Sequence, residues 1–193
     1  SGADWIIPFD ADEFWFGDRE TLAEGVRHID GDVVSARIYN VFPRRSGDWG
    51  MDVSPQLHGK VAFRSHRLAL LGMGNHDVDR PGRRVPLEGA HLQIAHLPWR
   101  SFDQFVNKVR QGRAAYEATD LAPALGNHWR HMGQQKAEEL KGQWARILDG
   151  KPVPGMHWCP RGELVGVDIR SWRTWDPFHV VPRSTGAALK AWD

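Results

Sequence analysis

The architecture of the chain follows from one segment, Trp5-Ile6-Ile7-Pro8-Phe9-Asp10-Ala11-Asp12-Glu13. Its residues 5–9 are aromatic and β-branched, which predicts a buried strand that ends near Pro8, because proline cannot donate to a sheet ladder. Three carboxylates then crowd the point where the strand stops. Ligands of open α/β sheets bind at the carboxyl ends of strands, so the segment predicts an α/β domain with a binding site at this edge.

Residues 10–13, the acidic turn, favour a cation. The carboxylates of Asp10, Asp12 and Glu13 are close in sequence and repel one another unless a positive charge lies among them. Mg²⁺ takes oxygen ligands and is often held by one or two carboxylates plus the phosphates of a substrate. The acidic turn therefore predicts a metal–diphosphate site, with Asp12 as the best direct ligand. A solvated acidic turn is the alternative interpretation.

Two blocks of sequence resemble one enzyme family. Ala3-Asp4-Trp5-Ile6-Ile7-Pro8-Phe9-Asp10-Ala11-Asp12-Glu13-Phe14-Trp15 resembles the Asp-x-Asp segment of family-2-like glycosyltransferases with the GT-A fold. Residues 94–105, followed by Lys108 and by residues 115–117, are similar to a downstream part of the same group. The resemblance spans about residues 3–135 and implies sugar transfer from a nucleotide-sugar donor to a carbohydrate or glycolipid acceptor.

The resemblance also implies roles for individual residues. It implies a divalent metal, Mn²⁺ or Mg²⁺, held by Asp12 and Asp10 with His96 as a further ligand, so the side chains of Asp12 and His96 should converge. An acidic base follows a glycine-rich turn in this family, and Asp77 takes that place, with His76 as the alternative. The usual Glu-Asp pair is absent. The remaining substrate-binding candidates are Glu13, Lys60, Gly74, His76, Arg100 and Trp15.

The position of the acidic turn in the chain carries a further expectation. In the GT-A fold, the strand–helix units that hold the base and ribose precede the Asp-x-Asp motif. The resemblance thus implies the C-terminal part of a GT-A-type mixed sheet, with residues 1–125 as the metal and acceptor half. Residues 126–193 form a helical and irregular extension on this view. The expected partner is an upstream nucleotide-binding segment of the same protein, without which the chain binds nucleotide sugar poorly.

Two other functions stay open. The run Gly74-Asn75-His76-Asp77 also matches the Gly-Asn-His-Asp/Glu segment of calcineurin-like metallophosphoesterases. Those hydrolases also need an early Asp-x-His and a late Gly-His-x-His, whereas this chain has Asp-Ala-Asp and no Gly-His-x-His. The other alternative is a non-catalytic binding domain derived from a transferase.

The composition sets outer limits. A chain of 193 residues is long enough for one domain with a sizeable core. Its net charge of +1 gives no reason to expect a nucleic acid as partner. The single cysteine, Cys159, excludes an intrachain disulfide and fits a reducing compartment. With no signal peptide and no apolar run of about 18 residues, we expect a cytoplasmic protein without a membrane span.

Hydrophobic patterns predict the other elements. Strands are predicted at residues 33–43, 60–64, 91–96 and 165–169, and helices at 18–28, 101–118 and 131–148. Asp18 and Ser101 are the predicted caps of the first two helices. We expect residues 5–9 and 33–42 to share one sheet, with helix 101–118 packed on it.

Finer features are predicted for the helix and the loops. Helix 101–118 has an apolar stripe, and Lys108 is expected on its solvent face; the stripe comprises Phe102, Phe105, Val109 and Ala115. Residues 44–57 are predicted as a surface loop, and residues 79–90 as a basic loop suited to cover a diphosphate. Prolines break up the chain after Gly150, which predicts an irregular tail held by Trp158, Trp172, Trp175 and Phe178.

Overall fold

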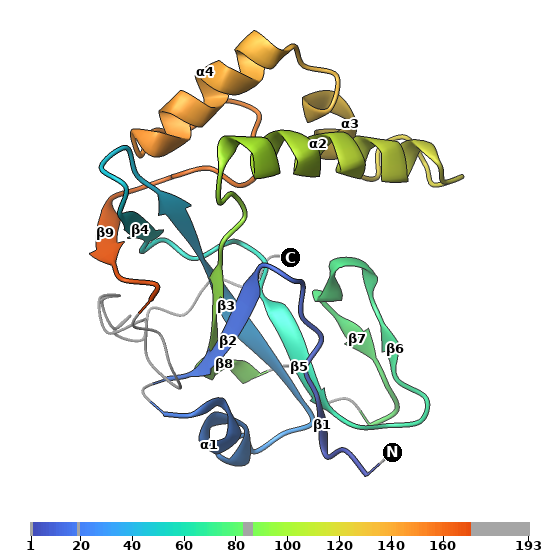
Figure 1. The fold of residues 1–193 in the computed structure, drawn as a ribbon. Helices are drawn as coiled ribbons and strands as arrows, with labels where there is room; N and C mark the ends of the chain where they lie inside the picture. The colour runs from blue at the N-terminus through green and yellow to red at the C-terminus, as the bar shows by residue number, and fades with distance from the viewer. Residues whose placement is uncertain (1, 19, 83–86, 171–193) are drawn as a thin grey trace.

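The long strand β3 organises the fold. The computed structural model describes residues 2–18, 20–82 and 87–170, which form a mixed sheet with helices beside it (Figure 1). The predicted α/β class is therefore confirmed. The strands of the described part are β1 Trp5–Ile6, β2 Glu13–Gly17, β3 Val33–Pro43, β4 Trp49–Asp52, β5 Lys60–Arg64, β6 Leu70–Leu71, β7 Val78–Asp79, β8 Leu87–His96 and β9 Leu164–Val167. Its helices are α1 Leu22–Arg27, α2 Phe102–Glu117, α3 Asn127–Met132, α4 Ala137–Leu148 and the short 3-10 helix η1 Met73–Asn75.

Three strands of the described part pair with β3. Strands β5 and β4 are antiparallel to it, and β8 is parallel. Strand β1 joins outside β5, β9 outside β4 and β2 outside β8, while β6 and β7 form a separate hairpin. Most side chains of β3 are buried because hydrophobic clusters cover both faces of the strand. One cluster contains Val34, Ala36 and Ile38, and another contains Tyr39 and Val41. The expected sharing of one sheet by the first strand and residues 33–42 is confirmed for Trp5–Ile6.

The register of β8 places His96 at the edge where the acidic turn lies. Across the parallel pair, Asn40 of β3 stands opposite His96, and the register shifts between Ser35 and Arg37. On the other side of β8, Glu13 stands opposite His96. His96 therefore lies between the end of β3 and the start of β2.

The first strand is shorter and more exposed than predicted. Only Trp5 and Ile6 are paired, with Arg64 and Phe63 of β5, and Phe9 is 68% exposed. Pro8 lacks the N–H that a longer ladder needs, so the chain leaves the sheet before reaching the acidic turn. The predicted buried strand over residues 5–9 is thus wrong in its second half.

Two predicted helices and one predicted loop differ from the structure. Helix α1 is capped by Thr21 rather than by Asp18: the Thr21 hydroxyl accepts a hydrogen bond from the Glu24 backbone N–H, and the Glu24 carboxylate accepts one from the Thr21 N–H. Ser101 caps α2 as predicted, with its hydroxyl 3.2 Å from the Gln104 nitrogen. The helix predicted over 131–148 is two helices, α3 and α4, and the predicted loop 44–57 contains strand β4.

The main core lies where the helices meet the end of β3. Phe105 and Val109 of α2 are fully buried against Phe42 and Trp99, and Leu140 and other residues of α4 complete the cluster. Figure 1 shows α2 crossing above the end of the sheet. Ala115, expected on the buried face, is exposed because the C-terminal half of α2 extends past this core. Helix α2 therefore meets the sheet only through its first half, at the end of β3, whereas its second half packs on α3.

The segment after α4 returns to the same core. The Trp99 indole N–H donates to the Trp158 carbonyl at 2.7 Å, which fixes the segment around residue 158 next to α2. Of the predicted tail, Trp158 belongs to this core, whereas Trp172, Trp175 and Phe178 lie outside the described residues. Among the described residues, no helix is both long and apolar enough to cross a membrane.

Candidate functional site

The acidic turn is closed by its own hydrogen bonds. The Glu13 N–H donates to the Asp10 carbonyl at 3.0 Å, and the Asp10 N–H donates to the Glu13 carboxylate at 3.2 Å. The Leu97 N–H donates to the Asp12 carbonyl at 2.9 Å, which ties the turn to the end of β8. The backbone therefore holds the three carboxylates in place next to His96.

Two lysines supply the positive charge that the acidic turn requires. The buried ammonium of Lys60 on β5 lies 2.6 Å from the Asp10 carboxylate and 2.9 Å from that of Glu13. Burial lowers the pKa of Lys60, but the hydrogen bonds to both carboxylates outweigh it and hold that pKa above its ordinary value. The ammonium of Lys108 on α2 bonds to the Asp12 carboxylate. Each carboxylate of the turn therefore has a cationic partner from the chain itself.

Asp12 and His96 converge as predicted. The Asp12 Oδ2 atom lies 3.4 Å from His96 Nε2, and the side chains of both are largely buried. Burial raises the pKa of Asp12, but the hydrogen bonds and charges of His96 and Lys108 lower it well below its ordinary range, so this carboxylate stays ionised. On the other side of the ring, His96 Nδ1 lies 2.9 Å from the side-chain oxygen of Asn40 and donates to it.

The pair of Asp12 and His96 fits two positions around a divalent cation. The Asn40 oxygen holds the proton of His96 on Nδ1, which leaves Nε2 as the coordinating atom when the ring is neutral. Two ligands at ~2.1 Å from one cation and at right angles lie ~3 Å apart, close to the observed separation. Among the described residues, no group of three or more His, Cys, Asp or Glu side chains is arranged to hold a metal. A cation here would take its other ligands from water and substrate.

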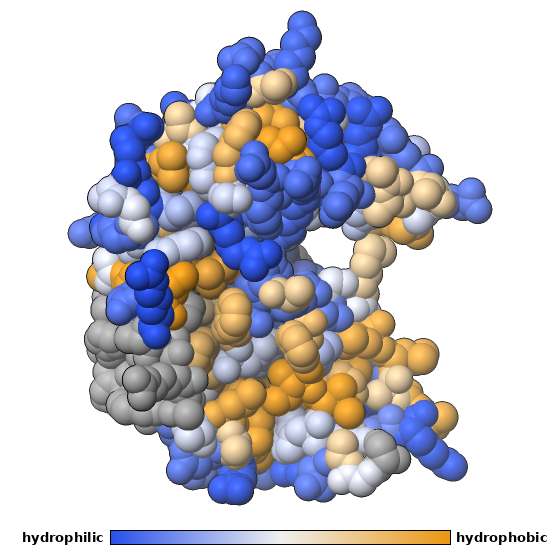
Figure 2. All heavy atoms as spheres, viewed as in Figure 1, coloured by the Kyte–Doolittle hydropathy of each residue, from blue (hydrophilic) through white to orange (hydrophobic). Residues whose placement is uncertain are grey.

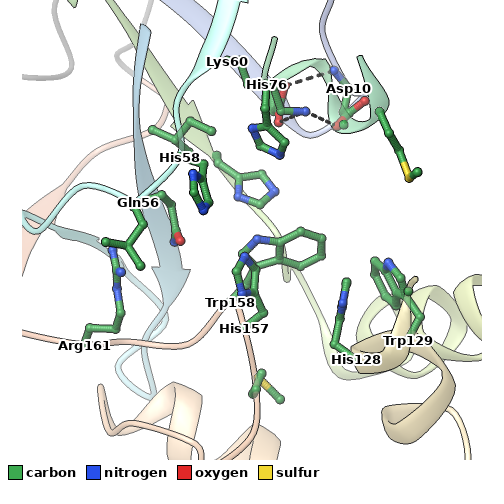
Figure 3. A pocket seen from close by; sticks show the side chains of 18 of the residues that line it. Asp10, Gln56, His58, Lys60, His76, His128, Trp129, His157, Trp158 and Arg161 are labelled. Atoms are coloured by element: carbon green, nitrogen blue, oxygen red, sulfur yellow. Dashed lines mark hydrogen bonds and ion pairs between the residues drawn. The ribbon is translucent and has the colours of Figure 1, made fainter. Parts of the chain in front are cut away.

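A pocket of about 640 Å³ opens beside the pair (Figure 3). His96 reaches its lining, and Asp12 lies behind His96. Five of the ten histidines of the chain line the pocket: His58, His76, His96, His128 and His157. Its other lining residues include Asp10, Glu13, Gln56, Lys60, Gly74, Tyr116, Trp129, Trp158 and Arg161. The pocket therefore joins the acidic turn, the β6–β7 hairpin, the helices and the segment after α4.

Trp158 stands at the centre of the aromatic wall. Its ring meets that of His96 edge-on, with centroids 5.3 Å apart, and that of Trp129 edge-on at the same distance. Figure 3 shows Trp158 and His157 facing the pocket from one side and His76 and His58 from the other. Partial burial lowers the pKa of His128, and so does the proximity of His157, because two protonated rings would repel each other. Partial burial lowers the pKa of His157, and so do Arg161 and the nearby His58, His76 and His96, so both rings favour the neutral state.

Six of the predicted site residues line the pocket: Asp10, Glu13, Lys60, Gly74, His76 and His96. Three do not. The side chain of Asp77 is exposed beyond the hairpin turn, where its carbonyl accepts the Gly72 N–H at 2.8 Å. Arg100 is exposed at the start of α2, and Trp15 belongs to the hydrophobic cluster covered by α1. Of the basic loop, Arg80 pairs with Asp32 at 3.3 Å, and Arg83 and Arg84 lie outside the described residues.

Lys108 is the main residue that the sequence prediction misplaced. Its side chain is only 25% exposed, and its ammonium lies 4.9 Å from the ring centre of Trp158 and 5.1 Å from that of Trp99. It was expected on the solvent face of α2. Lys108 follows Phe105 by three residues, so helical spacing places it at the border of the buried stripe. This spacing could have indicated from the sequence that its side chain is partly buried. No comparable pattern marks Trp158 or Arg161, because the segment between Gly150 and β9 has no periodicity.

Comparison with protein-family models, with curated proteins and with solved structures gave no match to this chain. We therefore infer a function from the geometry of the acidic turn, the Asp12–His96 pair and the pocket.

Proposed function

We propose that the chain carries the metal and acceptor site of a glycosyltransferase that moves a sugar from a nucleotide-sugar donor to a carbohydrate or glycolipid acceptor. The observation that carries the proposal is the contact of Asp12 with His96, which places an Asp-x-Asp carboxylate directly behind a late histidine that lines the pocket. The resemblance of the two sequence blocks adds to it, because the two residues come one from each block.

In this proposal the chain prepares the donor end of the pocket. Asp12 is held ionised, and Asn40 holds His96 in the orientation that presents Nε2. Lys60 fixes Asp10 and Glu13 so that the turn keeps its shape without substrate. A bound Mn²⁺ or Mg²⁺ would neutralise the charge that develops on the leaving diphosphate.

His76 is the better candidate for the base. Its Nδ1 lies 2.7 Å from the Gly59 carbonyl and donates to it, which leaves Nε2 to accept a proton from an acceptor hydroxyl. His76 lines the pocket, whereas Asp77, the first choice from the sequence, does not. Trp158 and Trp129 offer apolar faces against which a sugar ring can pack.

The alternatives differ in what they require. No observation favours the phosphoesterase, since Gly74-Asn75-His76-Asp77 forms the tip of the β6–β7 hairpin and only its glycine and His76 reach the pocket. A non-catalytic binding domain would bind the same ligands without turnover.

The buried free thiol of Cys159 suits the cytoplasmic location that we propose.

Calorimetric titration with nucleoside diphosphates and their sugars tests the proposal. We expect at least one of them to bind about tenfold more tightly with Mn²⁺ than with EDTA, and Asp12→Asn or His96→Ala to abolish this difference. His131→Ala is the matched control, because His131 is exposed and does not line the pocket. Equal affinity with Mn²⁺ and EDTA, or no binding at all, contradicts the proposal. Binding of a nucleotide sugar without release of the nucleoside diphosphate in the presence of acceptors supports the non-catalytic alternative.

A further inference from the structure

Large apolar side chains are exposed together on and beside the β6–β7 hairpin. Leu68, Leu70, Leu71 and Met73 of the hairpin are 57%, 70%, 41% and 61% exposed, and Leu57 is 81% exposed. We call these five residues the leucine face. Figure 2 shows the hydrophobic surface gathered on the side of the molecule where this hairpin lies. Exposed apolar surface that is concentrated in this way marks a place where a ligand or partner binds.

The leucine face is held in a fixed position. Leu70 pairs with Asp79 and Leu71 with Val78, and the Gly72 N–H donates to the Asp77 carbonyl at 2.8 Å. Val78 is fully buried against residues of β3 and β5, and Ala69 packs on the same cluster. The hairpin is therefore anchored through one side while its leucines point outward, so their exposure does not come from a loose loop.

The leucine face begins where the pocket opens. Leu57 and Met73 line the pocket and are also strongly exposed, so they belong to both surfaces. Inside the pocket the lining becomes polar, with Lys60, His76 and Arg161 among its residues. A ligand that enters along the hairpin would thus meet apolar surface first and hydrogen-bonding groups next.

We propose that the substrate taken by this pocket is an amphiphile: its hydroxyl-bearing head lies in the pocket, and its hydrocarbon chain lies on the leucine face. The identification of the head as the acceptor rests on the proposed function; the binding of the chain does not. A second copy of the protein is a poorer occupant, because a stable interface takes roughly 20–30 residues from each partner and the leucine face has five.

A series of alkyl glucosides tests the proposal on the full chain. Methyl, hexyl, heptyl and octyl glucosides are titrated calorimetrically below the concentrations at which they form micelles. We expect affinity to rise roughly two- to fourfold for each added methylene, since a hydrocarbon chain partly buried on leucines leaves water. Leu68→Gln/Leu70→Gln should remove the dependence on chain length and leave the affinity for methyl glucoside unchanged. Leu121→Gln, an exposed leucine outside the face, should keep the dependence.

Four results would overturn the amphiphile proposal. The first is an affinity that does not change with chain length, and the second is a length dependence that survives in the double variant. The third is a wild-type protein that binds no glucoside but dimerises in light scattering, with the dimer lost in the double variant. The fourth is binding to phosphatidylcholine vesicles without binding of monomeric glucosides. Titration of the same samples with nucleoside diphosphates and Mn²⁺ separates this proposal from the proposed function. Length dependence without diphosphate binding supports the amphiphile and contradicts the transferase; diphosphate binding without length dependence does the reverse.

Discussion

Replacing Lys108 by methionine should destabilise the protein by about 3 kcal/mol at pH 7. The substitution removes a charge-assisted hydrogen bond to Asp12, which contributes about 1.5–3 kcal/mol when the partner is poorly solvated, and only 13% of the Asp12 side chain is exposed. It also removes the contacts of the ammonium with the rings of Trp99 and Trp158, each worth about 0.5–1 kcal/mol. Methionine keeps the packing of the aliphatic stem, so the loss reports on the charge.

Urea unfolding followed by tryptophan fluorescence measures this loss. A change of about 3 kcal/mol corresponds to a fall in the melting temperature of about 6–12 °C for a chain of this size. Lys141→Met is the matched control, because Lys141 pairs with Glu138 on the exposed side of α4 and should cost less than about 0.5 kcal/mol. The explanation is refuted if the two variants lose the same stability, or if Lys108→Met lies within about 0.5 kcal/mol of the wild type.

The same variants carry a pH dependence with a defined sign. The folded protein lowers the pKa of Asp12, so the stability that this carboxylate contributes is present above its ordinary pKa of about 4 and is lost as the pH falls through the lowered value. Without Lys108 the lowering is smaller, so less stability is left to lose. The difference between the wild type and Lys108→Met should therefore shrink below about pH 4.

Three further outcomes are expected. Stability should be greatest above about pH 7 and fall as the pH drops through 6.5, because the lowered pKa values of His128 and His157 let the unfolded chain take up protons before the folded one. The midpoint of urea unfolding, plotted against pH, should change less steeply for His128→Gln than for the wild type. Leu140→Ala should cost about 2–5 kcal/mol in urea unfolding, because Leu140 is fully buried in the core below α4, whereas Leu121→Ala at an exposed site should cost less than about 0.5 kcal/mol. Lys60→Met should cost about 3–5 kcal/mol by the same assay, because it leaves buried carboxylate charge uncompensated.

The sequence predicts well those strands whose hydrophobic pattern matches their burial in the sheet. Residues 33–43 form a strand with the predicted bounds because their apolar run is buried on both faces, and residues 60–64 do so for the same reason. The predicted strand 5–9 extends too far because Pro8 ends its pairing. Strand β4 was missed because Trp49–Asp52 lies in a polar, glycine-containing stretch and pairs only with residues far along the chain.

The candidate site was predictable where a motif carries the chemistry. Asp12 and His96 were placed together because each belongs to a recognisable block, and the structure brings them within 3.4 Å. The counter-charge of Lys108 was not predicted, because helical spacing alone does not tell whether a residue at the border of the buried stripe points to solvent or inward. The contribution of Trp158 depends on a hydrogen bond from Trp99 to its backbone, which leaves no trace in the sequence.

The register shift in the pairing of β3 with β8 has a consequence for how the protein tolerates insertions and deletions. Successive side chains of a strand point to opposite faces, so a change of one residue in length between the shift and His96 would turn the imidazole away from Asn40 and Asp12. Such a change could leave the hydrophobic core around α2 and α4 intact, because none of His96, Asn40 and Asp12 belongs to that core. An insertion or deletion of one residue in β8 can thus leave a folded protein that lacks the candidate site. The length of β8 is therefore a sharper criterion for a functional homologue than overall sequence similarity.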